Sequence, residues 1–241
     1  MQARILEVCV DDADGLAAAI AGGADRIELC SALGVGGLTP TRGFMQLAAR
    51  SPIPVNAIIR PRIGGFVYSD DEIAIMLDDI EAACEAGLVG VVIGASSPDG
   101  SLDRATLQRL IRAAAKLDVT LHRAFDLVPD FHAAVETAID LGFSRILTSG
   151  GARHAEAGLP VLQRAAEVGA GRISIMPGGG VRPGNAAAFL AIPSVFELHA
   201  SCSQPVEPNA DLVDFGFSPL NARRTDADTV RHMKAILAQG R

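Results

Sequence analysis

The chain has 241 residues, 49% of them hydrophobic, with a formal net charge of −7 and a pI near 5.2. A nucleic-acid partner is excluded, because phosphate neutralisation needs clustered lysine and arginine, and Lys116 and Lys234 are the only lysines. No apolar run reaches the length of about 18 residues that a membrane span needs, so we expect no membrane contact. Charged residues near the N-terminus oppose a signal peptide, and the four cysteines lack the spacing of a disulfide framework. We therefore expect a cytoplasmic protein with free thiols.

Eight short runs have the composition of buried β-strands, and a helical or capped segment follows each one. No linker rich in proline, serine or charge divides the chain, which predicts a single domain over residues 1–241. Eight βα units in one domain predict an α/β fold, a (βα)8 TIM barrel of parallel strands with its active face at the C-terminal strand ends. A doubly wound open sheet is the alternative. The predicted strands are residues 4–10, 25–30, 55–60, 90–94, 119–123, 145–149, 172–176 and 195–199.

Helix boundaries and two long loops complete this pattern. Ser69 with Glu72 forms a predicted capping box, and we expect Gly22, Gly87 and Gly142 to end helices in the left-handed conformation. Residues 31–39 form a glycine-rich loop after the second strand, and residues 201–224 form another after the eighth. Both loops follow strand C-termini, and long loops at that end of a barrel are commonly functional.

Alternation along the strands predicts an unusually polar barrel lumen. In residues 4–10 the apolar Leu6, Val8 and Val10 pack on helices, and the intervening residues face inward. One interpretation is a structural ionic layer in which arginines neutralise glutamates, because a buried unpaired charge costs several kcal/mol. That layer would consist of Glu7, Glu28, Glu197, Arg26 and Arg60.

Inward-facing groups at the strand ends predict a ligand or metal site at the barrel mouth. Thiolate ligands select Cu(I), and thiolate with imidazole also suits Zn(II). The candidate metal ligands are Cys9, Cys30, His122 and His199. The alternative for each cysteine is a small core residue.

The same mouth would suit a small carboxylate or phosphate, bound by arginines, a hydroxyl and glycine-rich loops. The candidate binding residues are Arg60, Arg62, Arg123, Ser149, Gly178 and Gly179. Acid-base chemistry on such a metabolite would use Glu7, Glu28, His122 and Asp126. Alternation directs His122 into the lumen and Arg123 away from it. Neither lysine is expected at the mouth, which excludes Schiff-base aldolase chemistry.

Several motifs occur together and in order. They are Leu6-Glu7-Val8-Cys9-Val10-Asp11, Gly23-Ala24-Asp25-Arg26-Ile27-Glu28-Leu29-Cys30, Gly36-Gly37-Leu38-Thr39-Pro40, Ile59-Arg60-Pro61-Arg62, Tyr68-Ser69-Asp70, His122-Arg123-Ala124-Phe125-Asp126, Leu147-Thr148-Ser149-Gly150-Gly151 and Glu197-Leu198-His199. Together they resemble the CutC family. The resemblance implies a cytoplasmic (βα)8 barrel, a homo-oligomer such as a dimer or tetramer, and a role in copper homeostasis. It favours copper, as Cu(I), as the bound metal.

The resemblance is imperfect at two places. Where the family often reads Arg-Pro-Arg-Gly-Gly-Asp-Phe, this chain has Ile63-Gly64-Gly65-Phe66, so it lacks a carboxylate at position 65. The segment after Ser201 also matches poorly. The leading hypothesis is a copper-binding CutC-like barrel, and the alternative is a TIM-barrel enzyme of unassigned reaction acting on a small anionic metabolite.

Overall fold

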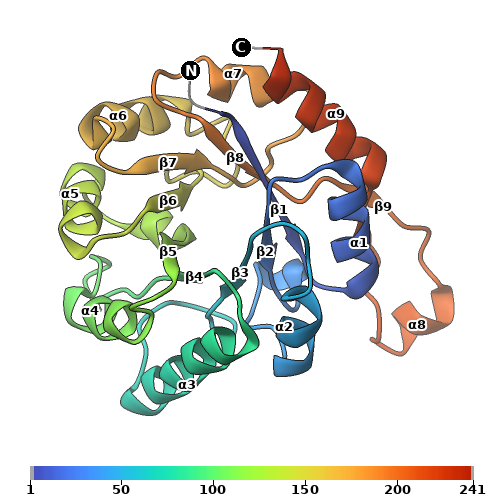
Figure 1. Cartoon of the computed structure of the whole chain (residues 1–241), viewed down its shortest axis with the longest axis horizontal. Coiled ribbons are helices and arrows are strands. Elements are labelled where there is room, and N and C mark those ends of the chain that lie inside the picture. The colour runs from blue at the N-terminus through green and yellow to red at the C-terminus, as the bar shows by residue number, and fades with distance from the viewer. Residues whose placement is uncertain (1–2, 240–241) are drawn as a thin grey trace.

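A nearly closed parallel barrel forms the centre of the molecule, in a computed structural model that describes residues 3–239 (Figure 1). Its strands follow one another in chain order, from β7 back to β1 and then to β8. β7 and β8 lie side by side and complete the ring. This order confirms the (βα)8 barrel rather than the open doubly wound sheet. The strands are β1 (Ile5–Val10), β2 (Arg26–Leu29), β3 (Val55–Ile58), β4 (Gly90–Ile93), β5 (Asp118–Leu121), β6 (Arg145–Thr148), β7 (Ser174–Pro177) and β8 (Glu197–Ala200).

Helices surround the barrel (Figure 1). The predicted capping box is present, since Ser69 and Glu72 exchange hydrogen bonds at the start of a helix. The described helices are α1 (Ala13–Gly22), α2 (Arg42–Ala48), α3 (Asp70–Ala86), α4 (Arg104–Ala113), α5 (Phe131–Leu141), α6 (Leu159–Gly169), α7 (Ala186–Leu190), α8 (Ala210–Asp214) and α9 (Ala227–Ala238), with the 3-10 helices η1 (Leu33–Val35) and η2 (Arg123–Leu127). Within residues 3–239, no helix has the length and apolar character needed to cross a membrane.

Glycine ends the predicted helices with one exception. Gly87 and Gly142 adopt positive φ after α3 and α5, as predicted. Gly22 is instead the last residue of α1, and Gly23 takes the left-handed position with φ of 87°. A Cβ at Gly22 would lie 2.4 Å from Cβ of Val230 in α9. Gly22 therefore permits close packing of α1 against α9, which local sequence does not reveal.

The alternation predicted along the strands is confirmed. Leu6, Val8 and Val10 of β1 are fully buried in the large core between barrel and helices. Inside the ring, the apolar side chains Cys9, Cys30, Ile58 and Val92 form a separate small cluster. The remainder of the lumen is polar, and this polarity distinguishes it from barrels filled with branched apolar side chains.

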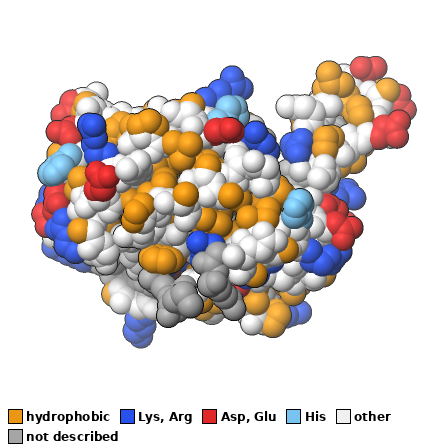
Figure 2. Space-filling model, turned by 90° about the horizontal axis from the view of Figure 1, so that it is seen from above, with side chains coloured by type: hydrophobic (Ala, Val, Ile, Leu, Met, Phe, Trp, Pro, Cys, Tyr) orange, Lys and Arg blue, Asp and Glu red, His pale blue; other side chains and the backbone are white. Residues whose placement is uncertain are grey.

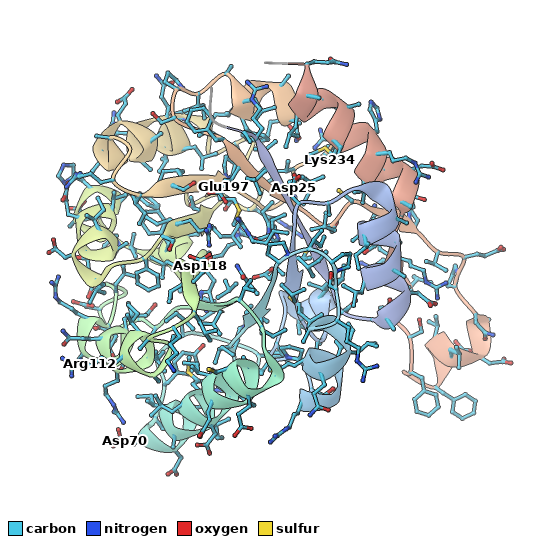
Figure 3. The ribbon with its side chains drawn as sticks, viewed as in Figure 1. Asp25, Asp70, Arg112, Asp118, Glu197 and Lys234 are labelled. Carbon is cyan, nitrogen blue, oxygen red and sulfur yellow. The ribbon has the colours of Figure 1, made fainter. Side chains whose placement is uncertain are left out.

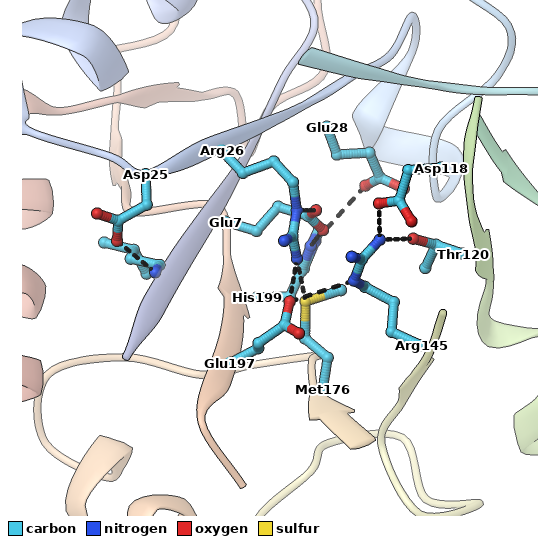
Figure 4. A network of polar contacts seen from close by, with 11 residues as sticks. Glu7, Asp25, Arg26, Glu28, Asp118, Thr120, Arg145, Met176, Glu197 and His199 are labelled. Carbon is cyan, nitrogen blue, oxygen red and sulfur yellow. Dashed lines mark hydrogen bonds and ion pairs between the residues drawn. The ribbon is translucent and has the colours of Figure 1, made fainter. Parts of the chain in front are cut away.

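A buried ionic layer crosses the lower lumen, the part near the N-terminal ends of the strands (Figure 4). Arg26 donates to Glu7 at 2.5 Å and also to Glu197, and Arg145 binds Glu197 at 3.2 Å and Thr120 at 2.8 Å. Asp118 completes the layer through Arg145. Figure 3 shows the labelled Asp118 and Glu197 within the ring, whereas Asp70 and Arg112 lie at its periphery.

This layer confirms the structural interpretation of Arg26, Glu7 and Glu197 and corrects that of Arg60. Arg145, an inward residue at the start of β6, occupies the position that we assigned to Arg60. Arg60 has no salt-bridge partner in the part of the chain that the structure describes, and it lies above the layer at the barrel mouth.

An arm formed by residues 201–224 stands off the body of the molecule (Figure 2). The short strands β9 (Ser203–Pro205) and β10 (Arg223–Thr225) pair antiparallel at its base, and α8 lies between them in the chain. Phe215, Phe217 and Leu220 are 76%, 79% and 72% exposed. Exposed apolar side chains of this kind are typical of protein-protein contacts. The predicted homo-oligomer remains a prediction.

Candidate functional site

A cavity of about 280 Å³ opens at the C-terminal strand ends, as the barrel fold predicts. Residues from seven of the eight barrel strands or the loops that follow them line it, and only β4 contributes none. Of the residues predicted as site members, seven line this cavity: Cys9, Glu28, Arg60, His122, Arg123, Gly179 and His199.

Three of these side chains form one compact group of donors. One ligand atom each from Cys9, Glu28 and His199 lie within 4.8 Å of one another, and all three residues are buried. The strand register produces this convergence, because β1 lies between β2 and β8. Cys9 is paired with Glu28 on β2, and Glu7 is paired with His199 on β8.

The orientation of His199 is determined by Glu7. Nδ1 of His199 donates to Oε1 of Glu7 at 2.8 Å, and Nε2 lies 3.6 Å from Oε2 of Glu28. Burial opposes the charge on Glu7, but Arg26 and His199 outweigh it and lower the pKa of Glu7 to about 2. Burial also opposes the imidazolium, but Cys9, Glu28 and Glu7 raise the pKa of His199 well above its ordinary value. Glu7 thus supports the group from below, in an ionised state.

Glu28 differs from Glu7 in having few partners. Burial, with a further contribution from the negative charge of Glu7, raises the pKa of Glu28 to about 7. Its Oε1 has no hydrogen-bond partner among the described residues. A carboxyl group with such a pKa can bind a cation or exchange a proton near neutral pH.

His122 lines the cavity on another side, as a neutral imidazole. Its Nδ1 accepts from the backbone N–H of Ala124 at 3.1 Å, at the start of η2, so the proton resides on Nε2. Burial and the charge of Arg60 lower the pKa of His122 to about 3. His122 lies outside the compact donor group, and its role as a metal ligand stays a prediction.

Cys30 is also outside this group. It is fully buried in the small apolar cluster of the lumen, and its Sγ approaches the backbone oxygen of Glu28 at 3.8 Å. Burial and the nearby Glu28 raise the pKa of its thiol well above the ordinary value. Cys9 belongs to the same cluster, but its thiol joins the compact group; the metal role predicted for Cys30 stays a prediction.

Two predicted anion-binding residues line the cavity together with Arg60. Arg123 does so because β5 ends at Leu121 and the chain turns into η2, so strand alternation no longer applies. Gly179, with φ of 91°, lies against the guanidinium of Arg123, where a Cβ would approach Cζ to 3.2 Å. Close contact between the two loops therefore requires glycine at this position.

Four other predicted site residues have structural contacts elsewhere. Asp126 accepts from Arg123, Thr148, Ser149 and Gly151, which ties η2 to the loop after β6. Ser149 also donates to the backbone oxygen of Ala152. Arg62 binds Glu72 and three carbonyl oxygens of its own loop, and Gly178 packs beneath His199. These four residues do not line the cavity.

Phe66 is a cavity residue that sequence reasoning missed. The centroid of its ring lies 4.9 Å from the centroid of the His122 ring and 5.3 Å from Cζ of Arg60. Phe66 lies in a loop without periodicity, so only its place beside Gly64 and Gly65 could have indicated it. Neither Lys116 nor Lys234 is among the residues that line the described cavity, and Lys234 binds Asp25.

The fold and the donor group together define a class of protein, a (βα)8 barrel with thiol, carboxyl and imidazole groups at its mouth. The family model of the CutC family matches residues 4–204. A relative from Rhizobium meliloti (strain 1021), named family protein CutC, is 56% identical over 234 residues, covering 96% of this chain and 95% of the relative. A Caulobacter vibrioides (strain NA1000 / CB15N) protein of the same name is 49% identical over 239 residues, covering 96% and 98%. This chain belongs to the CutC family.

Solved structures agree with this assignment. The crystal structure of the candidate copper homeostasis protein CutC from Streptococcus agalactiae is similar with a TM-score of 0.78 and 31% identity, covering 82% of this chain and 98% of that one. A thiamine phosphate pyrophosphorylase from Pyrococcus furiosus has a TM-score of 0.60 at 14% identity, covering 98% and 96%. The second similarity is to the barrel fold alone.

Proposed function

We propose that this protein binds copper, as Cu(I), at the barrel mouth through Cys9 and His199, with Glu28 beside them. The observation that carries the proposal is the convergence of these three donors, from three adjacent strands, within 4.8 Å. The copper homeostasis role named for the Streptococcus agalactiae relative supports it.

The chemistry of the donors fits the metal. Thiolate is a soft ligand that favours Cu(I), and imidazole suits copper and zinc. Metal-binding histidines commonly donate their second ring N–H to a carboxylate, and Glu7 accepts from Nδ1 of His199 at 2.8 Å. Glu28 is the harder ligand and makes Zn(II) the natural competitor. The bound metal would be cargo of this site, held by residues that the sheet already positions.

A titration of the metal-free protein with Cu(I), in competition with a chromophoric chelator and without oxygen, tests the proposal. Cys9→Ser is expected to weaken the affinity for Cu(I) by about a hundredfold, because the single thiolate of the group is lost. Cys84→Ser removes an exposed thiol of α3 and is the matched control, with unchanged affinity expected.

Cys30→Ser separates this site from the broader set of ligands that the sequence suggested. We expect affinity close to that of wild type, since Cys30 lies outside the donor group. Equal affinities for wild type and Cys9→Ser would contradict the copper site. A parallel Zn(II) titration shows whether the site prefers copper. The acid-base enzyme and the cytoplasmic location stay predictions.

A further inference from the structure

A buried cation without a matching anion lies at the barrel mouth. Arg60 is 7% exposed, and its guanidinium donates to the carbonyl oxygens of Val35 and Gly37, each at 2.9 Å, and of Gly64 at 3.1 Å. These neutral partners tie two loops together but leave the positive charge uncompensated. Its Nε has no partner among residues 3–239. Such a charge costs several kcal/mol unless an anion accompanies it.

A neutral hydrogen-bond donor lines the same cavity. His122 is 3% exposed, and because Nδ1 accepts from Ala124, its proton resides on Nε2. Nε2 has no acceptor in the described part of the chain. An unmade hydrogen bond of a buried N–H is unfavourable, so such a group commonly has an acceptor, either a water molecule or a ligand.

Phe66 connects these two groups. Its ring packs against both His122 and Arg60, at 4.9 Å and 5.3 Å. Phe66 follows Gly64, where φ is 92°, and Gly65, on the loop after β3. Nε of Arg60 and Nε2 of His122 are each covered, with less than 1 Å² of exposed surface, so a ligand reaches them when a covering side chain such as Phe66 shifts.

We propose that the cavity binds a small metabolite carboxylate, with Arg60 as the counter-cation and Nε2–H of His122 as the second donor. The five guanidinium N–H groups of Arg60 make three hydrogen bonds to carbonyl oxygens. The N–H of Nε has no partner among the described residues. A planar carboxylate can accept two parallel hydrogen bonds from one edge of a guanidinium, which a single point charge cannot. This binding site goes beyond the copper proposal and rests on different side chains.

The cavity volume limits the size of the ligand. The cavity volume is about 280 Å³. A short dicarboxylate or oxo acid fits this space.

Isothermal titration of protein freed of metal with EDTA tests the proposal, using succinate, its neutral diamide succinamide and inorganic phosphate as probes. Because no metal is present, the result does not depend on the copper site. Wild type is expected to bind succinate and to bind succinamide at least about tenfold more weakly, because an ionised group makes the stronger hydrogen bonds. Phosphate is expected to bind more weakly than succinate.

Two variants and one control locate the site. Arg60→Gln is expected to abolish succinate binding, whereas Arg62→Gln, which disturbs the same loop but lies outside the cavity, is expected to preserve it. His122→Asn retains a side-chain acceptor for the N–H of Ala124 and removes the Nε2 donor, so we expect about tenfold weaker binding in a folded protein.

The proposal is overturned if wild type binds none of the probes, if Arg60→Gln and wild type bind succinate equally, or if Arg62→Gln loses binding as fully as Arg60→Gln. Tighter binding of phosphate than of succinate would also overturn it. Thermal unfolding of each variant, followed by circular dichroism, establishes that the compared proteins are folded.

Discussion

Replacing Glu28 by glutamine should stabilise the metal-free protein at alkaline pH while it weakens the proposed metal site. Burial, reinforced by the charge of Glu7, raises the pKa of Glu28 from its ordinary value of 4.5 to about 7. The unfolded chain returns this carboxyl to its ordinary value. The difference corresponds to a free energy on the order of 3 kcal/mol, at about 1.4 kcal/mol per pKa unit.

The sign follows from which state holds the proton more tightly. Below pH 4.5 both states are protonated, and the favourable contribution of the neutral buried carboxyl is fully present. As the pH rises through about 7, the folded state loses its proton in a place where the charge is poorly compensated, and the contribution is lost. Glutamine does not titrate. The free energy of unfolding of Glu28→Gln relative to wild type should therefore rise by about 3 kcal/mol between about pH 4 and about pH 8.

Urea unfolding of wild type and Glu28→Gln in EDTA, at several pH values between these limits, measures this difference. Comparison within the pair removes most of the pH dependence of the other groups, including Glu7, whose lowered pKa acts in the opposite direction. Glu85→Gln removes an exposed carboxylate and reports the effect of surface charge alone. A difference that stays constant across the pH range would refute the burial argument for Glu28.

Three other substitutions probe the lumen. Glu197→Gln should lower the free energy of unfolding by about 3–5 kcal/mol, because Arg26 and Arg145 lose the carboxylate they share. Glu136→Gln, at the exposed pair with Arg172, should lower it by less than about 1 kcal/mol. Urea unfolding at neutral pH compares the two variants, and equal effects would contradict the buried layer. Glu7→Gln should weaken Cu(I) binding by about 10–100-fold, because His199 loses the carboxylate that orients its ring. The chelator titration used for Cys9→Ser measures this affinity, and an unchanged value would contradict the orienting role of Glu7. Gly94→Ala would place a Cβ 2.3 Å from Cε1 of His122, so it should weaken succinate binding and cost about 1–3 kcal/mol of stability, whereas Gly43→Ala has open space and should do neither.

The barrel and its inward side chains could be predicted from the sequence because both depend on local periodicity. All eight strands lie where alternation placed them, and Cys9, Glu28 and His199 face inward as expected. Which inward residues meet depends on register, and register is set by pairing between strands far apart in the chain. Arg60 and Arg145 show the limit, since both are inward arginines but only Arg145 reaches a carboxylate.

Residues beyond the strand ends are harder to place, because alternation ends where the strand ends. Arg123 follows β5 by two residues and lines the cavity only because η2 begins there. Asp126 sits in the same 3-10 helix and turns toward the loop after β6 instead. The separation of these two roles arises from backbone geometry that the sequence pattern does not contain.

Buried charged side chains have oppositely charged partners at one end of the lumen but not at the other, and this contrast supports the proposal of a ligand at the mouth. In the lower layer each arginine contacts two carboxylates, so the chain is able to pair buried charges fully. At the mouth, Arg60 has neutral partners only, and Glu28 leaves one oxygen unpaired among the described residues. Structural stability alone would favour pairing at both ends, since unpaired buried charge costs several kcal/mol. The unpaired groups at the mouth fit the proposed ligands, which would complete their interactions on binding.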